Sequence, residues 1–168
     1  MVRGEIQNII DKYNLQPHPE GGYYRETYRS EDRVTLVGFD RFPGERLAST
    51  AIIFMLTDSS FSAFHRIKSD ECWHFYFGGT LLIHMLYENG KYNQIKLGSN
   101  PDNNETFQAV IPTGAWFAAE CINGTAFSLV GCTVSPGFDF RDFELAKKSE
   151  LSPLYPEYES LINRLCRQ

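Results

Sequence analysis

The sequence lacks the features that mark nucleic-acid-binding and membrane-spanning proteins. Its 168 residues include 16 Lys and Arg against 21 Asp and Glu, a net charge of −5, and they contain no basic block. The electrostatic attraction that drives binding to nucleic acids is therefore missing. The longest apolar run, Ala51–Leu56, is far shorter than the roughly 20 residues of a membrane span. We expect neither a nucleic-acid partner nor a membrane.

Cysteine is scarce as well. The four cysteines, at positions 72, 121, 132 and 166, are scattered and form no C-x-x-C pair. Such spacing is typical of buried thiols in a reducing compartment rather than of a disulfide framework. The first residues, MVRGEIQNIID, have neither the apolar centre nor the cleavage site of a signal peptide. We therefore expect a cytoplasmic protein.

Aromatic residues, in contrast, are abundant. The chain has 13 Phe, 9 Tyr and 2 Trp, which favours a β-rich core or a pocket lined by flat side chains. Turn residues separate short candidate strands, and Asn89-Gly90 and Asn123-Gly124 are the strongest hairpin signals. The regular spacing of these strands is typical of a sandwich or barrel. The candidate strands are residues 23–30, 33–37, 49–57, 62–67, 72–77, 80–87, 93–97, 107–111, 116–120 and 126–134.

Helical patterns occur only near the two ends of the chain. Residues 4–13 repeat apolar side chains at i, i+3, i+4 and i+7, and residues 157–166 carry a similar face. A shorter helical pattern covers residues 138–148. No repeat or long linker divides the chain, so we expect one all-β domain over residues 1–168. Its expected parts are a helical segment at about 4–14, a jelly roll at about 20–136 and a helical tail at about 138–166.

Residues 59–79 carry the most informative polar side chains. Strand alternation places His65 on one face with Ala63 and Ile67, and Glu71 on one face with Trp73. If the two segments form a hairpin, His65 and Glu71 approach each other in an aromatic-lined cavity. A His beside a carboxylate can serve as a general base, and the same pair is half of a metal site. A purely structural pairing of the two buried side chains is the third interpretation.

The spacing H-x-I-x3-E-x6-G, from His65 through Glu71 to Gly78, resembles the first signature of the cupin superfamily. The segment Pro112–Phe117 resembles the second signature. Four strings are also similar to those of one cupin family of unknown function: PEGGYYRETYRS, FHRIKSDECWHFY, PTGAWFAAE and VGCTVSPGFDFRDFELA. Together these strings extend the resemblance from about residue 5 to residue 165. The resemblance implies a double-stranded β-helix, the cupin jelly roll.

The chain departs from the metal-binding cupin pattern at two positions. Ile67 and Phe117 stand where metal-binding cupins have further His residues, and neither side chain can coordinate a cation. Only His65 and Glu71 remain of the ligand set. We therefore expect no cofactor and no tightly bound metal. An enzyme that holds a metal weakly through His65 and Glu71, completed by water or substrate, is one alternative.

The resemblance also extends to the metal-free deoxysugar-nucleotide epimerases, which share a related jelly roll. It implies that His65 is the base, supported by Glu71, that Tyr23 donates a proton and that Arg25 contacts an anionic substrate. Glu20 is expected to shape a turn, His18 to lie in a loop, and His74 and His84 to be interface or core residues. The aromatic residues expected to line the ligand pocket are Trp73, Phe75, Trp116 and Phe117.

These features favour a protein that binds a small organic molecule, such as a sugar or nucleotide sugar, in its barrel. In its enzymatic form it is a metal-independent isomerase or epimerase. A non-catalytic module that binds or senses a small ligand is the main alternative, and the weak-metal enzyme is the other. By analogy with cupins of this size, we expect a homodimer formed by exchange of the strand at residues 23–30.

Overall fold

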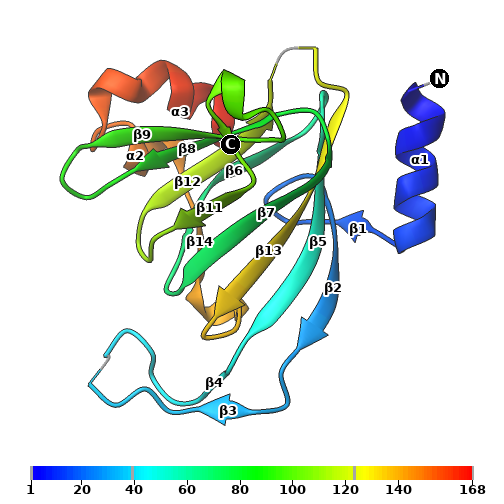
Figure 1. Cartoon of the computed structure of the whole chain (residues 1–168). Coiled ribbons are helices and arrows are strands. Elements are labelled where there is room, and N and C mark those ends of the chain that lie inside the picture. Colours follow the sequence, from blue (N-terminus) through cyan, green and yellow to red (C-terminus); the bar gives the residue numbers. More distant parts are fainter. Residues whose placement is uncertain (1, 39, 123, 168) are drawn as a thin grey trace.

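The computed structural model describes residues 2–38, 40–122 and 124–167, and two facing β-sheets form its body (Figure 1). The first sheet has six strands in the order β1 (Gln16–Pro17), β2 (Tyr23–Arg29), β5 (Thr50–Thr57), β13 (Phe127–Ser135), β7 (Asp70–Gly78) and β11 (Gln108–Ile111). The second has the order β10 (Glu105–Thr106), β9 (Tyr92–Leu97), β8 (Leu81–Leu86), β12 (Trp116–Cys121), β6 (Phe61–Ile67) and β14 (Phe143–Leu145). A small pair, β3 (Arg33–Val34) and β4 (Arg46–Leu47), forms an arm below the body.

The chain crosses repeatedly between the two sheets. Strands β5, β6 and β7 follow one another in sequence, yet β6 lies in the second sheet, whereas β5 and β7 lie in the first. Strand β13 fills the space between β5 and β7 and pairs antiparallel with both. This interleaving makes the double-stranded β-helix of a jelly roll, so the predicted all-β fold class is confirmed.

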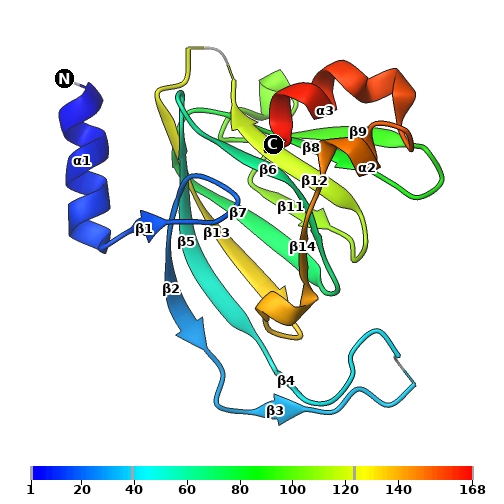
Figure 2. The same ribbon diagram turned by 180° about the vertical axis from the view of Figure 1, so that it is seen from behind.

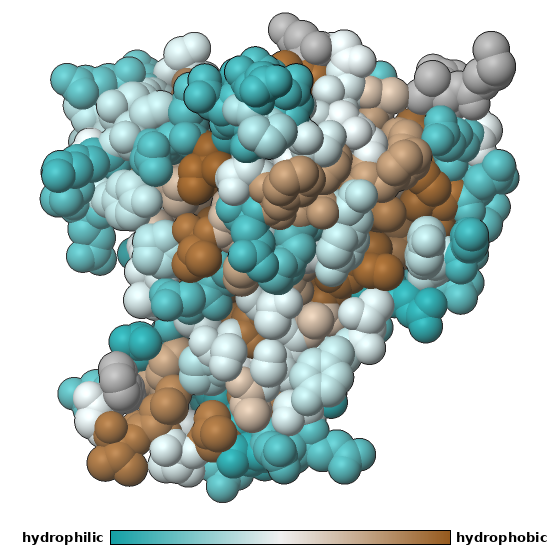
Figure 3. Space-filling view, in the orientation of Figure 1, coloured by the Kyte–Doolittle hydropathy of each residue, from teal (hydrophilic) through white to brown (hydrophobic). Residues whose placement is uncertain are grey.

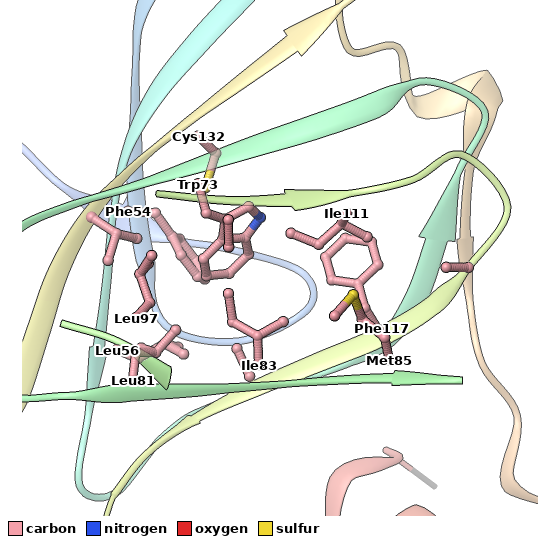
Figure 4. Close-up of a cluster of buried hydrophobic side chains, with 14 residues drawn as sticks. Phe54, Leu56, Trp73, Leu81, Ile83, Met85, Leu97, Ile111, Phe117 and Cys132 are labelled. Atoms are coloured by element: carbon pink, nitrogen blue, oxygen red, sulfur yellow. The ribbon is translucent and has the colours of Figure 1, made fainter. Parts of the chain in front are cut away.

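The hydrophobic core fills one end of the barrel. Phe54 and Leu56 on β5, Trp73 on β7 and Phe117 on β12 point between the sheets and are almost completely buried. Figure 4 shows Trp73 in the middle of this cluster, between Phe54 and Phe117. Its ring lies 5.7 Å from that of Phe54 and 6.3 Å from that of Phe117, both in edge-on geometry. The inward positions at the other end of the same strands are left to line a cavity.

Helices cover the outer faces of both sheets (Figure 2). Helix α1 (Val2–Tyr13) agrees with the predicted helix at residues 4–13 and packs its apolar face on the first sheet, beside Met55 and Leu129. Helices α2 (Lys148–Leu151) and α3 (Glu159–Leu165) cover the second sheet, and α3 agrees with the helix predicted at residues 157–166. No described helix has both the length and the apolarity needed to cross a membrane, and all four cysteines are free thiols.

Residues 138–148 differ from the helix that their pattern predicts. They form a 3-10 turn at Phe140–Asp142 and then strand β14, which pairs with β6 and forms the edge of the second sheet. Backbone groups of an exposed strand edge need partners, and this pairing outweighs a short amphipathic pattern. The Asn89-Gly90 hairpin signal is confirmed between β8 and β9, with Gly90 at a φ of 80°. The Asn123-Gly124 signal falls partly outside the described residues.

Candidate functional site

A cavity of about 440 Å³ lies between the sheets at the end of the barrel opposite the aromatic core. The same strands build both regions, because inward residues alternate along each strand. On β5, for example, Phe54 belongs to the core while Thr50 and Ile52 line the cavity. The remaining lining residues are Gln16, His18, Glu20, Tyr24, Glu26, Arg29, His65, Ile67, Glu71, Cys132, Val134, Phe138, Asp139 and Phe140.

His65 projects from β6 into this cavity and is held in one orientation. Its Nδ1 lies 2.7 Å from the carbonyl oxygen of Ala63, which can only accept a hydrogen bond. Nδ1 therefore carries the hydrogen. The imidazole ring stacks on Phe117 at 4.0 Å between ring centroids, and only 2% of the residue is exposed. The chemically available atom of His65 is therefore Nε2.

The carboxylate beside His65 belongs to Glu20, a residue expected only to shape a turn. Its Oε2 lies 3.1 Å from Nε2 of His65, and its Oε1 accepts a hydrogen bond from the Ser62 hydroxyl at 2.9 Å. The backbone follows β6 closely, because the Glu20 carbonyl accepts from the Ala63 N–H. Gly21 permits this approach: a Cβ atom there would lie 2.0 Å from the Phe61 carbonyl oxygen, and its φ is +121°.

His18 lies on the other side of Glu20. The backbone N–H of Glu20 donates to Nδ1 of His18 at 3.3 Å, and the same Nδ1 lies 3.6 Å from Glu20 Oε2. The His18 ring packs edge-on against Tyr24 at 4.5 Å. Burial lowers the pKa of His18, and a lone pair on Nδ1 agrees with a neutral ring. The Pro-rich turn at residues 17–22 thus supplies two polar groups to the cavity, which sequence reasoning assigned to a loop.

One proton is shared between Glu20 and His65. Because Nδ1 of His65 already donates to Ala63, Nε2 either accepts a hydrogen from a protonated Glu20 or donates one as imidazolium. Burial raises the pKa of Glu20 and lowers that of His65 to about 4. Both shifts favour the uncharged form of each group. Burial therefore favours the neutral pair, with the proton on Glu20 and a hydrogen bond to Nε2.

Glu71 faces the same cavity from the opposite sheet. Burial raises its pKa to about 8, and repulsion from Glu20 when that group is ionised adds to the rise, whereas the Cys132 thiol and Trp73 indole oppose it. The sequence-based expectation that a hairpin brings Glu71 against His65 differs from the structure, because β6 and β7 lie in different sheets. Both residues line the cavity, but the direct partner of His65 is Glu20.

The structure places Tyr23 and Arg25 on the outer face of the first sheet. Tyr23 packs against the cluster under α1, and Nη1 of Arg25 donates to the Tyr13 carbonyl at 3.2 Å. Alternation turns their neighbours Tyr24 and Glu26 inward. The register between β2 and β5 then shifts after Glu26, which brings Arg29 to the cavity side as well. The cavity arginine is thus Arg29.

The aromatic residues predicted to bind a ligand lie around the cavity rather than on its wall. Trp73 and Phe117 belong to the core, with Phe75 packed against it. Trp116 lies on the other side of the second sheet, where the Arg66 guanidinium covers it at 4.4 Å. None of these four described residues is among those that line the cavity.

The described residues of the cavity do not include the ligand set of a metal-binding cupin. Ile67 lines the cavity and Phe117 lies against His65, at the two positions where metal-binding cupins would have further His residues. In the described part of the chain, no group of three or more His, Cys, Asp or Glu side chains is arranged to hold a metal ion. The described residues therefore do not fit the metal centre of those cupins.

Two interleaved sheets around a polar cavity form a jelly roll, an architecture found in cupins and also in lectin and viral capsid domains. The family model of the Cupin superfamily (DUF985) matches residues 7–146, and the chain belongs to this family. An uncharacterized protein of Saccharomyces cerevisiae, YML079W, is 31% identical over 152 residues, covering 84% of this chain and 75% of the yeast protein.

Two solved structures are similar over nearly the whole chain. A hypothetical protein from Leishmania major has a TM-score of 0.89 and 33% identity, covering 96% of this chain and 98% of its own. Protein SO0799 from Shewanella oneidensis has a TM-score of 0.84 and 37% identity, covering 96% of each chain. None of the three relatives is named for an activity, so they support the fold and the family but no particular reaction.

Proposed function

We propose that this cupin binds a small organic molecule in its barrel cavity and moves a proton on it without a metal ion. The observation that carries the proposal is the contact on the cavity wall between Nε2 of His65 and the Glu20 carboxyl group, 3.1 Å away. The cavity volume of about 440 Å³ lies within the range of small-molecule sites. Its mixture of hydroxyl, amide, carboxyl and apolar side chains suits a sugar or the sugar part of a nucleotide sugar.

The reaction class is isomerisation or epimerisation next to a carbonyl group. The protonated Glu20 donates its hydrogen to the carbonyl oxygen of the ligand, while Nε2 of His65 takes the proton from the adjacent carbon. The products of this step are an enol, a Glu20 carboxylate and a His65 imidazolium, so charge and protons balance. Delivery of a proton to the opposite face of that carbon, as the enol hydrogen returns to the Glu20 carboxylate, gives the epimer. Glu71, protonated below about pH 8, offers a second proton donor from the opposite sheet.

The test is exchange of carbon-bound hydrogen with solvent deuterium. Sugars, nucleotide sugars and small hydroxy acids that raise the melting temperature are incubated with the protein in D2O and followed by proton NMR. We expect loss of the signal of the hydrogen beside the carbonyl in at least one ligand. Glu20→Gln and His65→Gln should each slow this exchange by about a hundredfold or more.

His84→Gln is the matched control, because the buried His84 side chain pairs with the half-buried Glu120 away from the cavity. Exchange should be unchanged in this variant. A ligand that binds tightly but shows no exchange in the wild-type protein would mean that the protein is a non-catalytic binding module. Elemental analysis of the same sample completes the test. Exchange that is lost on chelation and restored by a stoichiometric metal would contradict the metal-independent reaction.

We also infer that two copies of the chain pair through the outer face of the first sheet in a cytoplasmic homodimer. Strand β2 is paired with β5 of its own chain, so the support comes from the face rather than from strand exchange. Tyr28, Tyr76 and Val110 are each more than half exposed on this face. Figure 3 shows further hydrophobic side chains between α1 and the body. Light scattering should report a dimer, and Tyr76→Lys with Val110→Lys should give a monomer.

A further inference from the structure

A second, outer pocket adjoins the cavity and is built largely from arginines. It has a volume of about 260 Å³ and shares Arg29, Phe138 and Asp139 with the inner cavity. Three segments meet there: the end of β2, the β3–β4 arm and the turn between β13 and β14 (Figures 1 and 2). Figure 3 shows the surface indented between the body and this arm. The pocket therefore lies where the barrel cavity meets the arm.

Four of the ten arginines of the chain line this small pocket, although the net charge of the protein is −5. No described lysine lines it. Guanidinium groups present planar, forked donors that match the oxygens of a phosphate group better than the point charge of lysine does. The charged lining residues are Arg29, Arg33, Arg46, Arg141, Glu45 and Asp139.

The four arginines divide into one anchor and three donors. Arg46 is buried, forms two hydrogen bonds with Asp142 at 2.6 and 2.9 Å, and donates to the carbonyls of Pro43 and Glu45. Its donors are thus used to fix the arm to the turn between β13 and β14. Arg141 bonds Asp139 through Nε and Nη2 and leaves Nη1 without a hydrogen-bond partner among the described residues.

Arg29 and Arg33 supply the donors that a ligand can reach. Arg29 uses Nε and Nη2 to bond Glu26 at 2.8 and 2.6 Å, and its Nη1 bonds no other described residue. The pair is exposed, with 55% of the Arg29 side chain accessible, so exchange of Glu26 for a ligand anion costs little. The Arg33 guanidinium makes no hydrogen bond or ion pair with any residue that the structure describes.

The inner cavity has the opposite character. Its buried end carries two carboxyl groups, Glu20 and Glu71, and no buried arginine or lysine among the described residues. An anionic group is disfavoured there, whereas hydroxyl and carbonyl groups can be hydrogen-bonded. A ligand that spans both pockets would therefore place its uncharged part inside and its anionic part outside.

We propose that the outer pocket binds the phosphate or diphosphate group of the ligand through Arg29, Arg33 and Arg141. The inference rests on the proposed function for the identity of the inner part, and it names phosphorylated or nucleotide-linked sugars as the ligand class. Arg29, at the junction, moves from Glu26 to the phosphate oxygens when the ligand binds. Asp139 holds Arg141 in place, and Arg141 in turn lowers the pKa of Asp139 to about 2.

Inorganic pyrophosphate is the probe, titrated into the full chain by calorimetry at low ionic strength. We expect saturable binding to the wild-type protein, weakened about tenfold in Arg29→Gln and in Arg33→Gln. Glu26→Gln frees Arg29 and should tighten binding. Arg25→Gln is the matched control, because Arg25 lies on the same strand but on the opposite face of the sheet. It should bind pyrophosphate as the wild type does.

Absence of binding, or equal weakening by Arg25→Gln and Arg29→Gln, would overturn the proposal. Citrate that competes as strongly as pyrophosphate would overturn the assignment to phosphate. The result is separable from the proton-transfer reaction, since His65→Gln should keep pyrophosphate affinity. If an unphosphorylated sugar exchanges its hydrogen while pyrophosphate fails to bind, only the outer pocket has been assigned wrongly. Pyrophosphate binding without exchange of any compound leaves the outer site and removes the reaction.

Discussion

Two His–Glu pairs of the protein have nearly the same separation but differ in their surroundings: the Glu20 side chain is 8% exposed and that of Glu120 is 22% exposed. Nε2 of His65 lies 3.1 Å from Glu20, and Nε2 of His84 lies 3.0 Å from Glu120. The first pair lines the barrel cavity. The second lies between the outer face of the second sheet and the C-terminal helix α3. The same two residue types at the same distance thus serve two regions of the molecule.

The groups that bind each Glu side chain besides the His explain the difference. Glu120 bonds Arg164 of α3 as well as His84, whose Nδ1 lies 2.8 Å from the Tyr92 hydroxyl. Burial tends to raise the pKa of Glu120, but hydrogen bonds from His84 and Arg164 lower it overall. Among the described residues, Glu20 has a neutral hydroxyl, Ser62, as its additional side-chain hydrogen-bond donor, and burial raises its pKa. The same two residue types thus form an ionised Glu120 beside His84 in one region and a neutral proton donor, Glu20, beside His65 in the other.

The largest expected effect is a difference in the pH dependence of stability. The pKa of Glu71 is raised to about 8, so between about pH 6.5 and 8 the folded state holds a proton that the unfolded state has lost. Stability is then lost as pH rises through this range, by at most about 2 kcal/mol for one full proton. His65, with its pKa lowered to about 4, contributes the opposite slope only between about pH 4 and 6.5.

Urea unfolding at pH 6.5 and 8 measures this slope. Glu71→Gln should flatten it, because the amide does not titrate, whereas Glu120→Gln should leave it unchanged. Glu20, whose pKa is also raised, contributes to the slope in the same direction. The double variant Glu20→Gln, Glu71→Gln completes the series. If its stability changes with pH as much as that of the wild type, the two cavity carboxyl groups are ionised at neutral pH.

The next effect compares the two carboxyl groups directly. Glu120→Gln removes a charge that Arg164 and His84 both bind, and we expect it to destabilise the protein by about 1.5 kcal/mol. Glu20→Gln replaces a neutral acid by an amide that can still donate to Nε2 of His65 and accept from Ser62. Its cost should be no more than about 0.5 kcal/mol. A larger loss of stability in Glu20→Gln than in Glu120→Gln would reverse the assignment of charge.

The smallest effect concerns the ion pair between Arg164 and Glu120. The Arg164 side chain is 53% exposed, so its ion pair with Glu120 is screened by solvent. Arg164→Gln should therefore cost only about 0.5 kcal/mol. The difference between wild type and variant should shrink further in 1 M NaCl, where the screening length is roughly 3 Å. A cost that persists undiminished in high salt would indicate packing rather than charge at this position.

Much of the fold could be predicted from the sequence. The ten predicted strand segments, the helices at residues 4–13 and 157–166 and the turn at Asn89-Gly90 follow from local periodicity and turn chemistry, whereas the short strands β1, β4 and β10 were not predicted. Residues 138–148 could not be assigned in this way, because β14 forms only where the free edge of β6 is available to pair with it. That edge is created by the tertiary fold.

Less of the candidate site could be predicted. His65 and Glu71 lie on the cavity as expected, but alternation along residues 23–30 gives two faces without saying which is inward. Tyr24 and Glu26, rather than Tyr23 and Arg25, face the cavity. The sequence around Glu20 gave only a weak indication of a site residue: a carboxylate in a turn that prolines and glycines mark. Its contact with His65 depends on a turn 45 residues earlier reaching the same strand.

The sequence by itself determined that the chain is β-rich and carries a cupin pattern. It also determined that His65 is the candidate site residue of that pattern and that the set of metal ligands is incomplete. Periodicity, turn residues and donor types are local properties, and a single chain displays them directly. Only the tertiary structure decided that Glu20 pairs with His65, that Arg29 replaces Arg25 at the cavity and that four arginines meet beside it. These contacts join segments far apart in sequence, and burial, which sets the proton on Glu20, exists only once the sheets have closed.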